Sequence, residues 1–181
     1  MVVQISIRTT RLKIIPFADE HLTDVYIGWL NNSYVVRYSE QRHREHNLQS
    51  CREFADRFKT SNDSFCAIEA DDLGHIGNLI VTRDAPNQTA DLSIMIGAPS
   101  AQGQGYGTEA WGAVLAHLLE IEGLRKVTAG TMAANIAMVR IMKKAGMTIE
   151  GVRPKQFLLD GVEMDLVFAG VCANNWKAPA Q

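Results

Sequence analysis

A glycine-rich segment near the middle of the chain carries the residue pattern that most directly suggests chemistry. Residues 93–119 read SIMIGAPSAQGQGYGTEAWGAVLAHLL, and this pattern predicts a strand, a loop and then an amphipathic helix. Gly103, Gly105 and Gly107 allow the loop backbone to approach a bulky ligand and to adopt positive φ angles. The helix offers unpaired N–H groups and the positive end of its dipole. The segment therefore predicts a backbone site for an anion such as a pyrophosphate.

Three other interpretations of this loop can be compared with its spacing. A P-loop requires Gly-Lys-Ser/Thr at its end, which this segment lacks. A dinucleotide-binding fold requires G-x-G-x-x-G after the first strand of a βαβ unit, whereas these glycines alternate and follow a later strand. A plain surface turn stays open, although a turn rarely needs three alternating glycines between a buried strand and an amphipathic helix. The spacing favours a phosphate-binding loop of another kind.

Hydrophobic periodicity and turn residues predict the elements that must position this loop. Before the loop, we expect a strand at 11–17, a helix that Asp19 caps and that runs to Leu30, a helix around 51–58, and strands at 64–70, 75–83 and 88–97. After the loop, we expect a helix that ends at Gly123, a strand at 125–131, and a helix from Asn135 to Lys144 that Gly146 closes. The last two strands are expected at 147–159 and 162–172, joined by a turn at Asp160-Gly161. This order predicts an α+β fold, in which helices cover the faces of a mixed sheet.

Length and composition limit the classes of protein to which the chain can belong. The 181 residues are 46% hydrophobic and 21% charged, so we expect a single domain over 1–181, with its core at about 9–172 and a short tail at 173–181. The net charge of −2 argues against a nucleic-acid partner. Cys51, Cys66 and Cys172 lie in apolar patterns and are expected to be buried free thiols. No apolar run reaches the roughly 20 residues that span a bilayer, and no signal peptide is apparent, so we expect a cytoplasmic protein without a membrane partner.

The glycine loop and the elements after it resemble the Gcn5-related N-acetyltransferase (GNAT) superfamily. The motif Gln102-x-x-Gly105-x-Gly107 is similar to the Gln/Arg-x-x-Gly-x-Gly/Ala signature of that superfamily. Three further segments resemble the branch of the ribosomal-protein N-terminal (alanine/serine) acetyltransferases. They are the helix sequence GTEAWGAVLAHLL, the helix that begins at Asn135 and ends in KAGM at 144–147, and the last hairpin.

This resemblance runs from Arg11 to about Val171. It implies a GNAT-like mixed, mostly antiparallel sheet with a splayed central strand pair and helices on both faces. It also implies an enzyme that transfers an acetyl group from acetyl-CoA, as cosubstrate, directly to a primary amine.

The resemblance further implies which residues meet acetyl-CoA. Backbone groups of Ile94, Met95 and Ile96 would bind the amides of the pantetheine arm. The backbone N–H groups that would hold the pyrophosphate belong to Gln102, Gly103, Gln104, Gly105, Tyr106, Gly107 and Thr108. Asn135 would meet the cosubstrate near its thioester end, and it would also serve as a helix cap. No metal is expected, because the five histidines show no metal-ligand spacing.

The catalytic residues are less evident than the cofactor loop. A general base is useful because an alkyl ammonium of pKa about 10 is mostly protonated at neutral pH. Asp91 stands where relatives often carry Glu, and Glu40 follows the first helix, so both are candidate bases. Met142 and Met138 occupy positions where relatives carry a Tyr or a Ser. Neither methionine donates a proton, so the coenzyme A thiolate would leave unassisted or take its proton from water.

The amine acceptor is left open by the sequence. The resemblance to the ribosomal-protein branch favours a peptide N-terminal α-amine, whereas residues 29–38 are similar to first-helix segments of relatives that acetylate amino sugars or other small amines. Arg37, Arg42 and Arg44 would pair with an acidic or phosphorylated acceptor, or would simply face solvent. A non-catalytic acyl-CoA-binding sensor is an alternative of another class. A monomer and a homodimer are both compatible with the sequence.

Overall fold

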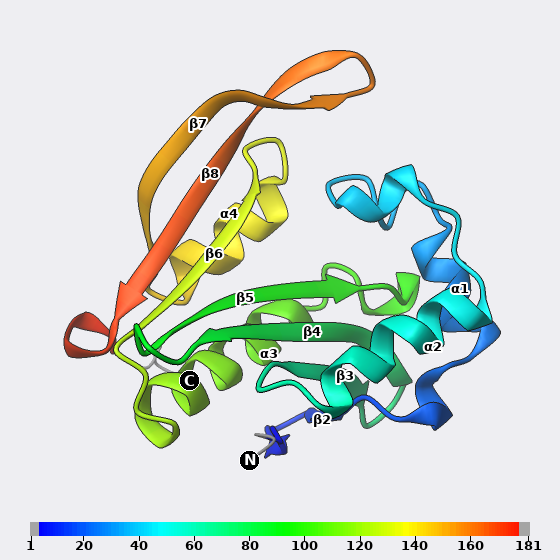
Figure 1. The fold of residues 1–181 in the computed structure, drawn as a ribbon, viewed down its shortest axis with the longest axis horizontal. Helices are drawn as coiled ribbons and strands as arrows, with labels where there is room; N and C mark the ends of the chain where they lie inside the picture. The colour runs from blue at the N-terminus through cyan, green and yellow to red at the C-terminus, as the bar shows by residue number, and fades with distance from the viewer. Residues whose placement is uncertain (1–3, 178–181) are drawn as a thin grey trace. The chain divides into compact units, whose positions relative to one another are not determined.

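The computed structural model describes residues 4–177. Its strands are β1 (Ile7–Arg8), β2 (Leu12–Pro16), β3 (Ser64–Ala70), β4 (Gly74–Asp84), β5 (Thr89–Ile96), β6 (Lys126–Met132), β7 (Thr148–Leu159) and β8 (Val162–Cys172) (Figure 1). Its α-helices are α1 (Asp24–Leu30), α2 (Leu48–Asp56), α3 (Tyr106–Ala116) and α4 (Ile136–Lys144). The strands form one sheet in the order β1-β2-β3-β4-β5-β6-β8-β7, in which most neighbours are antiparallel, so the predicted mixed fold is confirmed.

The chain forms two compact units. The first comprises residues 4–82 with Ile94–Ala110, and the second comprises Arg83–Ser93 with residues 111–177. The single domain expected over 1–181 stays a prediction. Within residues 4–177, no helix has the length and apolar character that crossing a membrane requires.

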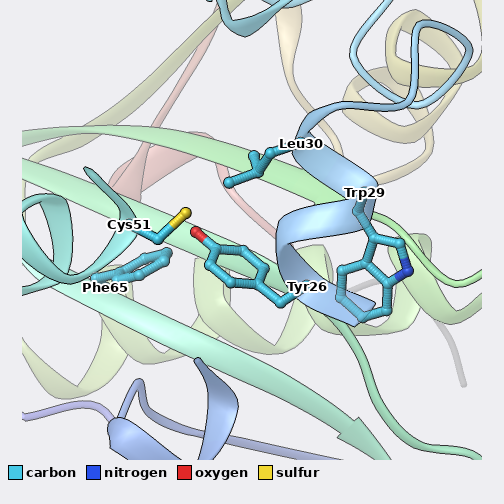
Figure 2. Close-up of a cluster of buried hydrophobic side chains, with 5 residues drawn as sticks. All are labelled: Tyr26, Trp29, Leu30, Cys51 and Phe65. Carbon is cyan, nitrogen blue, oxygen red and sulfur yellow. The ribbon is translucent and has the colours of Figure 1, made fainter. Parts of the chain in front are cut away.

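The first unit buries side chains on both faces of β3. Leu12, Ile14 and Ile68 of the antiparallel pair β2–β3 are fully buried. Figure 2 shows Tyr26, Trp29 and Leu30 of α1 gathered with Cys51 of α2 and Phe65 of β3. The phenol oxygen of Tyr26 points toward Cys51, and burial raises the pKa values of both groups. Met95 of β5 packs against the same cluster, so α1 and α2 are anchored on the strand that leads into the glycine loop.

The first helix begins later than the sequence predicts. Asp19 does not cap it; Asp19–His21 form a separate 3₁₀ turn, and α1 starts after Thr23, whose hydroxyl accepts the Tyr26 N–H at 3.2 Å. The cause is local, because the Ala18 N–H donates to Nδ1 of His21 at 2.9 Å and closes the turn early. The second helix lies earlier than the expected 51–58, since α2 runs from Leu48 to Asp56 and a 3₁₀ turn follows.

The second unit contains the strands and helix that follow α3. β5 pairs in parallel with β6 at three positions, Thr89 to Asp91 against Lys126 to Thr128, and β6, β8 and β7 then pair antiparallel. The β7–β8 turn has positive φ at Asp160 (52°) and Gly161 (81°), as the sequence predicts for a two-residue hairpin. Asn135 caps α4, and Gly146 follows it with φ of 83°, so both predicted helix boundaries are confirmed.

The thiol predictions hold in part. None of the three cysteines forms a disulfide within the described residues; Cys51 and Cys66 are buried, whereas Cys172, at the end of β8, is only partly buried.

Candidate functional site

The glycine loop of the first unit presents a group of unpaired backbone donors. Gly103 and Gly105 have φ of 74° and 84°, a region that side chains disfavour. Gln102 and Gln104 donate their N–H groups within the loop, to Pro99 and Ala101 at 3.2 and 3.4 Å. Among the described residues, no protein acceptor faces the N–H groups of the remaining five predicted loop residues: Gly103, Gly105, Tyr106, Gly107 and Thr108. Four of these five stand at the N-terminus of α3, where the helix dipole favours an anion.

Arg11, in the turn between β1 and β2, contacts the glycine loop and holds it in place. Its Nη1 donates to the Gln104 carbonyl at 3.1 Å, and its guanidinium carbon lies 4.3 Å from the centre of the Tyr106 ring. Its Nε and Nη2 lie 2.8 and 2.7 Å from Oε2 of Glu109, in the first turn of α3. Sequence reasoning missed this contact, because Arg11 and Glu109 are far apart in the chain.

The Arg11 contact also explains how an acidic residue is tolerated beside an anion site. Thr9 donates its hydroxyl to Oε1 of Glu109 at 2.6 Å, and the Arg11 N–H donates to the same oxygen at 3.0 Å. Burial alone would raise the pKa of Glu109, but the hydrogen bonds from Thr9 and Arg11 hold that pKa below its ordinary value. The negative charge is therefore neutralised locally and does not oppose a bound diphosphate.

Tyr106 is held in place by its side chain and offers only its backbone to a ligand. It is buried, and its hydroxyl donates to Asp72 at 3.0 Å. Desolvation and the Asp72 carboxylate raise the pKa of this phenol. Tyr106 is thus a structural anchor of the loop and a poor proton donor.

The end of β5, where the pantetheine arm was expected, is followed by hydrogen bonds to β4. Ile94, Met95 and Ile96 are half-buried. Beyond them, the N–H groups of Gly97 and Ala98 both donate to the Ile76 carbonyl, at 2.9 and 3.1 Å. Hydrogen bonds to β4 therefore fix the chain directly after β5.

Asp91 of β5 and Thr128 of β6 lie opposite each other in the parallel strand pair of the second unit. The Thr128 hydroxyl donates to Oδ2 of Asp91 at 2.9 Å. Although part of the Asp91 side chain remains exposed, desolvation by its surroundings raises the pKa of the carboxyl, and the Thr128 bond opposes this only partly. A carboxylate with a raised pKa is a stronger base than an ordinary one.

The side chain of Asn135 makes two hydrogen bonds, one to α4 and one to β6. Its Oδ1 accepts the Met138 N–H at 3.2 Å, and its Nδ2 donates to Oγ1 of Thr131 at 3.2 Å. One Nδ2 hydrogen is left for a ligand. Met142 is fully buried and Met138 is half-buried, and neither side chain has a proton to donate.

Glu40, the other predicted base, is exposed on a 3₁₀ turn of the first unit. Its Oε1 accepts from Nη1 of Arg42 at 2.8 Å, and its Oε2 lies 4.0 Å from Nε2 of His43. This ion pair occupies the Glu40 carboxylate, whereas Asp91 accepts only from the neutral hydroxyl of Thr128. The geometry therefore favours Asp91 over Glu40.

A pocket of about 440 Å³ lies at the connection between α1 and α2. It is lined by Leu30, Asn31, Ser33, Val36, Arg42, Arg44 and Glu45. Leu30 also belongs to the core cluster against which Met95 of β5 packs. Two arginines and one glutamate give the pocket no excess of negative charge.

The closest approach to a metal-ligand set in the described part of the chain is Glu20, His21 and Glu69. Nδ1 of His21 accepts the Ala18 N–H, so in the neutral ring the proton must lie on Nε2. Nε2 faces Glu69 at 3.3 Å and donates to it. Both ring nitrogens of His21 are therefore engaged by hydrogen bonds within the chain.

Comparisons with known proteins identify the family. A family model described as an acetyltransferase (GNAT) domain matches residues 11–148. A search of curated proteins gave no significant match. The spermidine N-acetyltransferase of Vibrio cholerae, solved with CoA and spermine, is 18% identical with a TM-score of 0.82, covering 92% of this chain and 98% of that chain.

Two acetyltransferases of ribosomal proteins have the same fold as this chain. RimL, a ribosomal L7/L12 α-N-protein acetyltransferase solved with coenzyme A, is 15% identical with a TM-score of 0.80 and coverage of 91% and 95%. The ribosomal-protein-S5-alanine acetyltransferase of Vibrio fischeri is 14% identical with a TM-score of 0.77 and coverage of 96% and 99%. At such low identities, the TM-scores show a common fold and nothing more. The family model spans the glycine loop together with most of the chain. The chain therefore belongs to the GNAT family of acetyltransferases.

Proposed function

We propose that this acetyl-CoA-dependent N-acetyltransferase acts on the α-amine of a peptide or protein N-terminus, with Asp91 as its general base. The observation that carries the cosubstrate assignment is the group of unpaired N–H donors from Gly105 to Thr108 at the start of α3. Such donors suit a diphosphate, which coenzyme A contains. Ile94, Met95 and Ile96 would bind the pantetheine arm, and the spare Nδ2 hydrogen of Asn135 would meet the thioester end.

In this proposal the amine nitrogen attacks the thioester carbonyl carbon, the carbon–sulfur bond breaks, and the amine proton passes to Asp91. An α-amine has a pKa near 8, so a carboxylate with a moderately raised pKa is an adequate base. Neither Met138 nor Met142 donates a proton, so the coenzyme A thiolate leaves as an anion or takes a proton from water. Positioning supplies most of the acceleration.

The pocket between α1 and α2 supports an acceptor that is not a polyamine. Arg42 and Arg44 line it with a single glutamate, so it lacks the excess of negative charge that would favour a polycationic acceptor. A volume of about 440 Å³ suits the first side chains of a peptide. These features favour a peptide over spermidine, the acceptor named for one structural neighbour.

The test is acceptor-dependent release of coenzyme A thiol. Peptides that begin with Ala or Ser should release thiol, whereas the same peptides with a blocked N-terminus and an unblocked lysine should not. Spermidine and glucosamine complete the panel. Faster turnover of spermidine or glucosamine than of any peptide would contradict the acceptor assignment, and tight coenzyme A binding without thiol release from any amine would favour a sensor.

A further inference from the structure

Two glycines allow the end of β5 to be held between β4 and α1. A Cβ built on Gly77 of β4 would overlap the Met95 carbonyl oxygen, and it would lie 3.0 Å from the Cα of Ile96. A Cβ built on Gly97 would overlap the indole ring of Trp29. Gly77 therefore lets the backbone of β4 meet that of β5 at Met95, and Gly97, directly after β5, lets the Trp29 ring lie against the chain.

His75 contacts both Gly77 of β4 and Trp29 of α1. Its Nε2 lies 3.0 Å from the Gly77 carbonyl, and because a carbonyl only accepts, Nε2 must carry the proton. Its ring centre lies 5.0 Å from that of Trp29, at an interplanar angle of 61°. One side chain thus links the glycine that β5 touches on β4 to the indole that covers Gly97.

The position of His75 is fixed from its other side by a second histidine. The ring of His21 lies 5.0 Å from that of His75, and His21 itself is held by the Ala18 N–H and by Glu69. The rings of Phe17 and Tyr26, each 6.1 Å away, complete the surroundings. The titratable groups that face His75 are therefore His21 of the 3₁₀ turn before α1, Tyr26 of α1 and Glu69 of β3.

We propose that His75 is a positioning residue for acetyl-CoA, because it holds Gly77 and Trp29 where they fix the end of β5 for the pantetheine arm. This role rests on the proposed function, in which Ile94 to Ile96 bind that arm. The diphosphate loop is fixed separately, by Arg11 and by the bond from Tyr106 to Asp72. The loss of His75 should therefore weaken binding of the pantetheine arm and leave binding of the diphosphate unchanged.

The protonation state of His75 is consistent with this role. Burial, followed by the proximity of His21, lowers the pKa of His75 to about 4. The ring is neutral near pH 7 and keeps its single donor for the Gly77 carbonyl.

The test compares coenzyme A with 3′-phospho-ADP, the part of coenzyme A that lacks the pantetheine arm. His75→Phe keeps the ring and removes the donor, and we expect it to bind coenzyme A about tenfold more weakly while binding 3′-phospho-ADP as the wild type does. His75→Gln keeps a donor and should show a smaller, equally selective loss. Phe54→Leu is the control, because Phe54 packs on Phe58 and Phe65 in the same core and should leave the ratio of the two affinities unchanged.

The role of His75 would be overturned if a folded His75 variant lost affinity for coenzyme A and for 3′-phospho-ADP equally. It would also be overturned if the ratio of these two affinities stayed at the wild-type value. Failure of the wild-type protein to bind coenzyme A would instead overturn the proposed function, and this role with it. The two failures are distinguishable by the wild-type titration alone.

Discussion

The glycine loop of the first unit and the Asp91 and Asn135 region of the second unit are built in different ways. The loop offers backbone N–H groups, and its side chains serve to hold it, as Arg11 and Tyr106 do. Asp91 and Asn135 instead offer side-chain atoms, each already engaged with a threonine. A backbone site depends on chain conformation and tolerates many side chains, whereas a side-chain site depends on the identity of single residues. This contrast explains why acetyl-CoA binding is easier to assign here than the base or the acceptor.

The largest expected effect tests the side-chain region. Asp91→Asn removes the proposed base, and kcat should fall about 10³-fold, within the usual range for such groups. The acidic limb of the pH–rate profile should disappear, because the wild-type rate falls as protonation of Asp91 removes the base. Thr128→Val is the companion variant. It removes the bond that lowers the pKa of Asp91, so the acidic limb should move to higher pH. A D91N profile like that of the wild type would remove Asp91 from the mechanism.

The next effect tests the backbone region. Gly105→Val forces a β-branched residue into φ of 84°, and we expect coenzyme A affinity to fall at least about 100-fold, as measured by calorimetry. Gly112→Ala in α3 is the matched control, because a Cβ there meets nothing within 4 Å. Wild-type affinity in a folded G105V protein would refute the loop as the diphosphate site.

A third prediction concerns stability and His75. Its pKa is about 6.5 in the unfolded chain and about 4 in the folded protein, so the unfolded state binds the proton first as pH falls. The contribution to stability is therefore present above pH 6.5 and is lost between about pH 6.5 and pH 4, by roughly 2–3 kcal/mol. Urea unfolding at several pH values should show this slope in the wild type and a flatter one in His75→Gln. Equal slopes would contradict the assignment.

The smallest effect tests how the loop is supported. Arg11→Gln leaves the Glu109 carboxylate without its main partner beside the anion site, and coenzyme A affinity should fall about tenfold. The double variant R11Q/E109Q should recover most of this loss, since the unpaired charge is gone. Arg8→Gln breaks an exposed pair with Asp71 and serves as the control. No recovery in the double variant would show that Arg11 acts by another route.

The sequence predicts what depends on neighbours in the chain. Asp160-Gly161, the Asn135 cap and Gly146 each encode a local backbone conformation, and each is found where predicted. Asp19 failed as a cap because the side chain of His21 closes a turn that no capping preference anticipates. The Arg11–Glu109 pair and the contact of His75 with Trp29 join distant segments, and only the folded chain brings them together.

The most direct test of the backbone site is a crystal structure of the protein with coenzyme A. We predict diphosphate oxygens about 3 Å from the backbone nitrogens of Gly105, Tyr106, Gly107 and Thr108. A bound coenzyme A whose diphosphate lies away from these nitrogens would contradict the assignment of the loop.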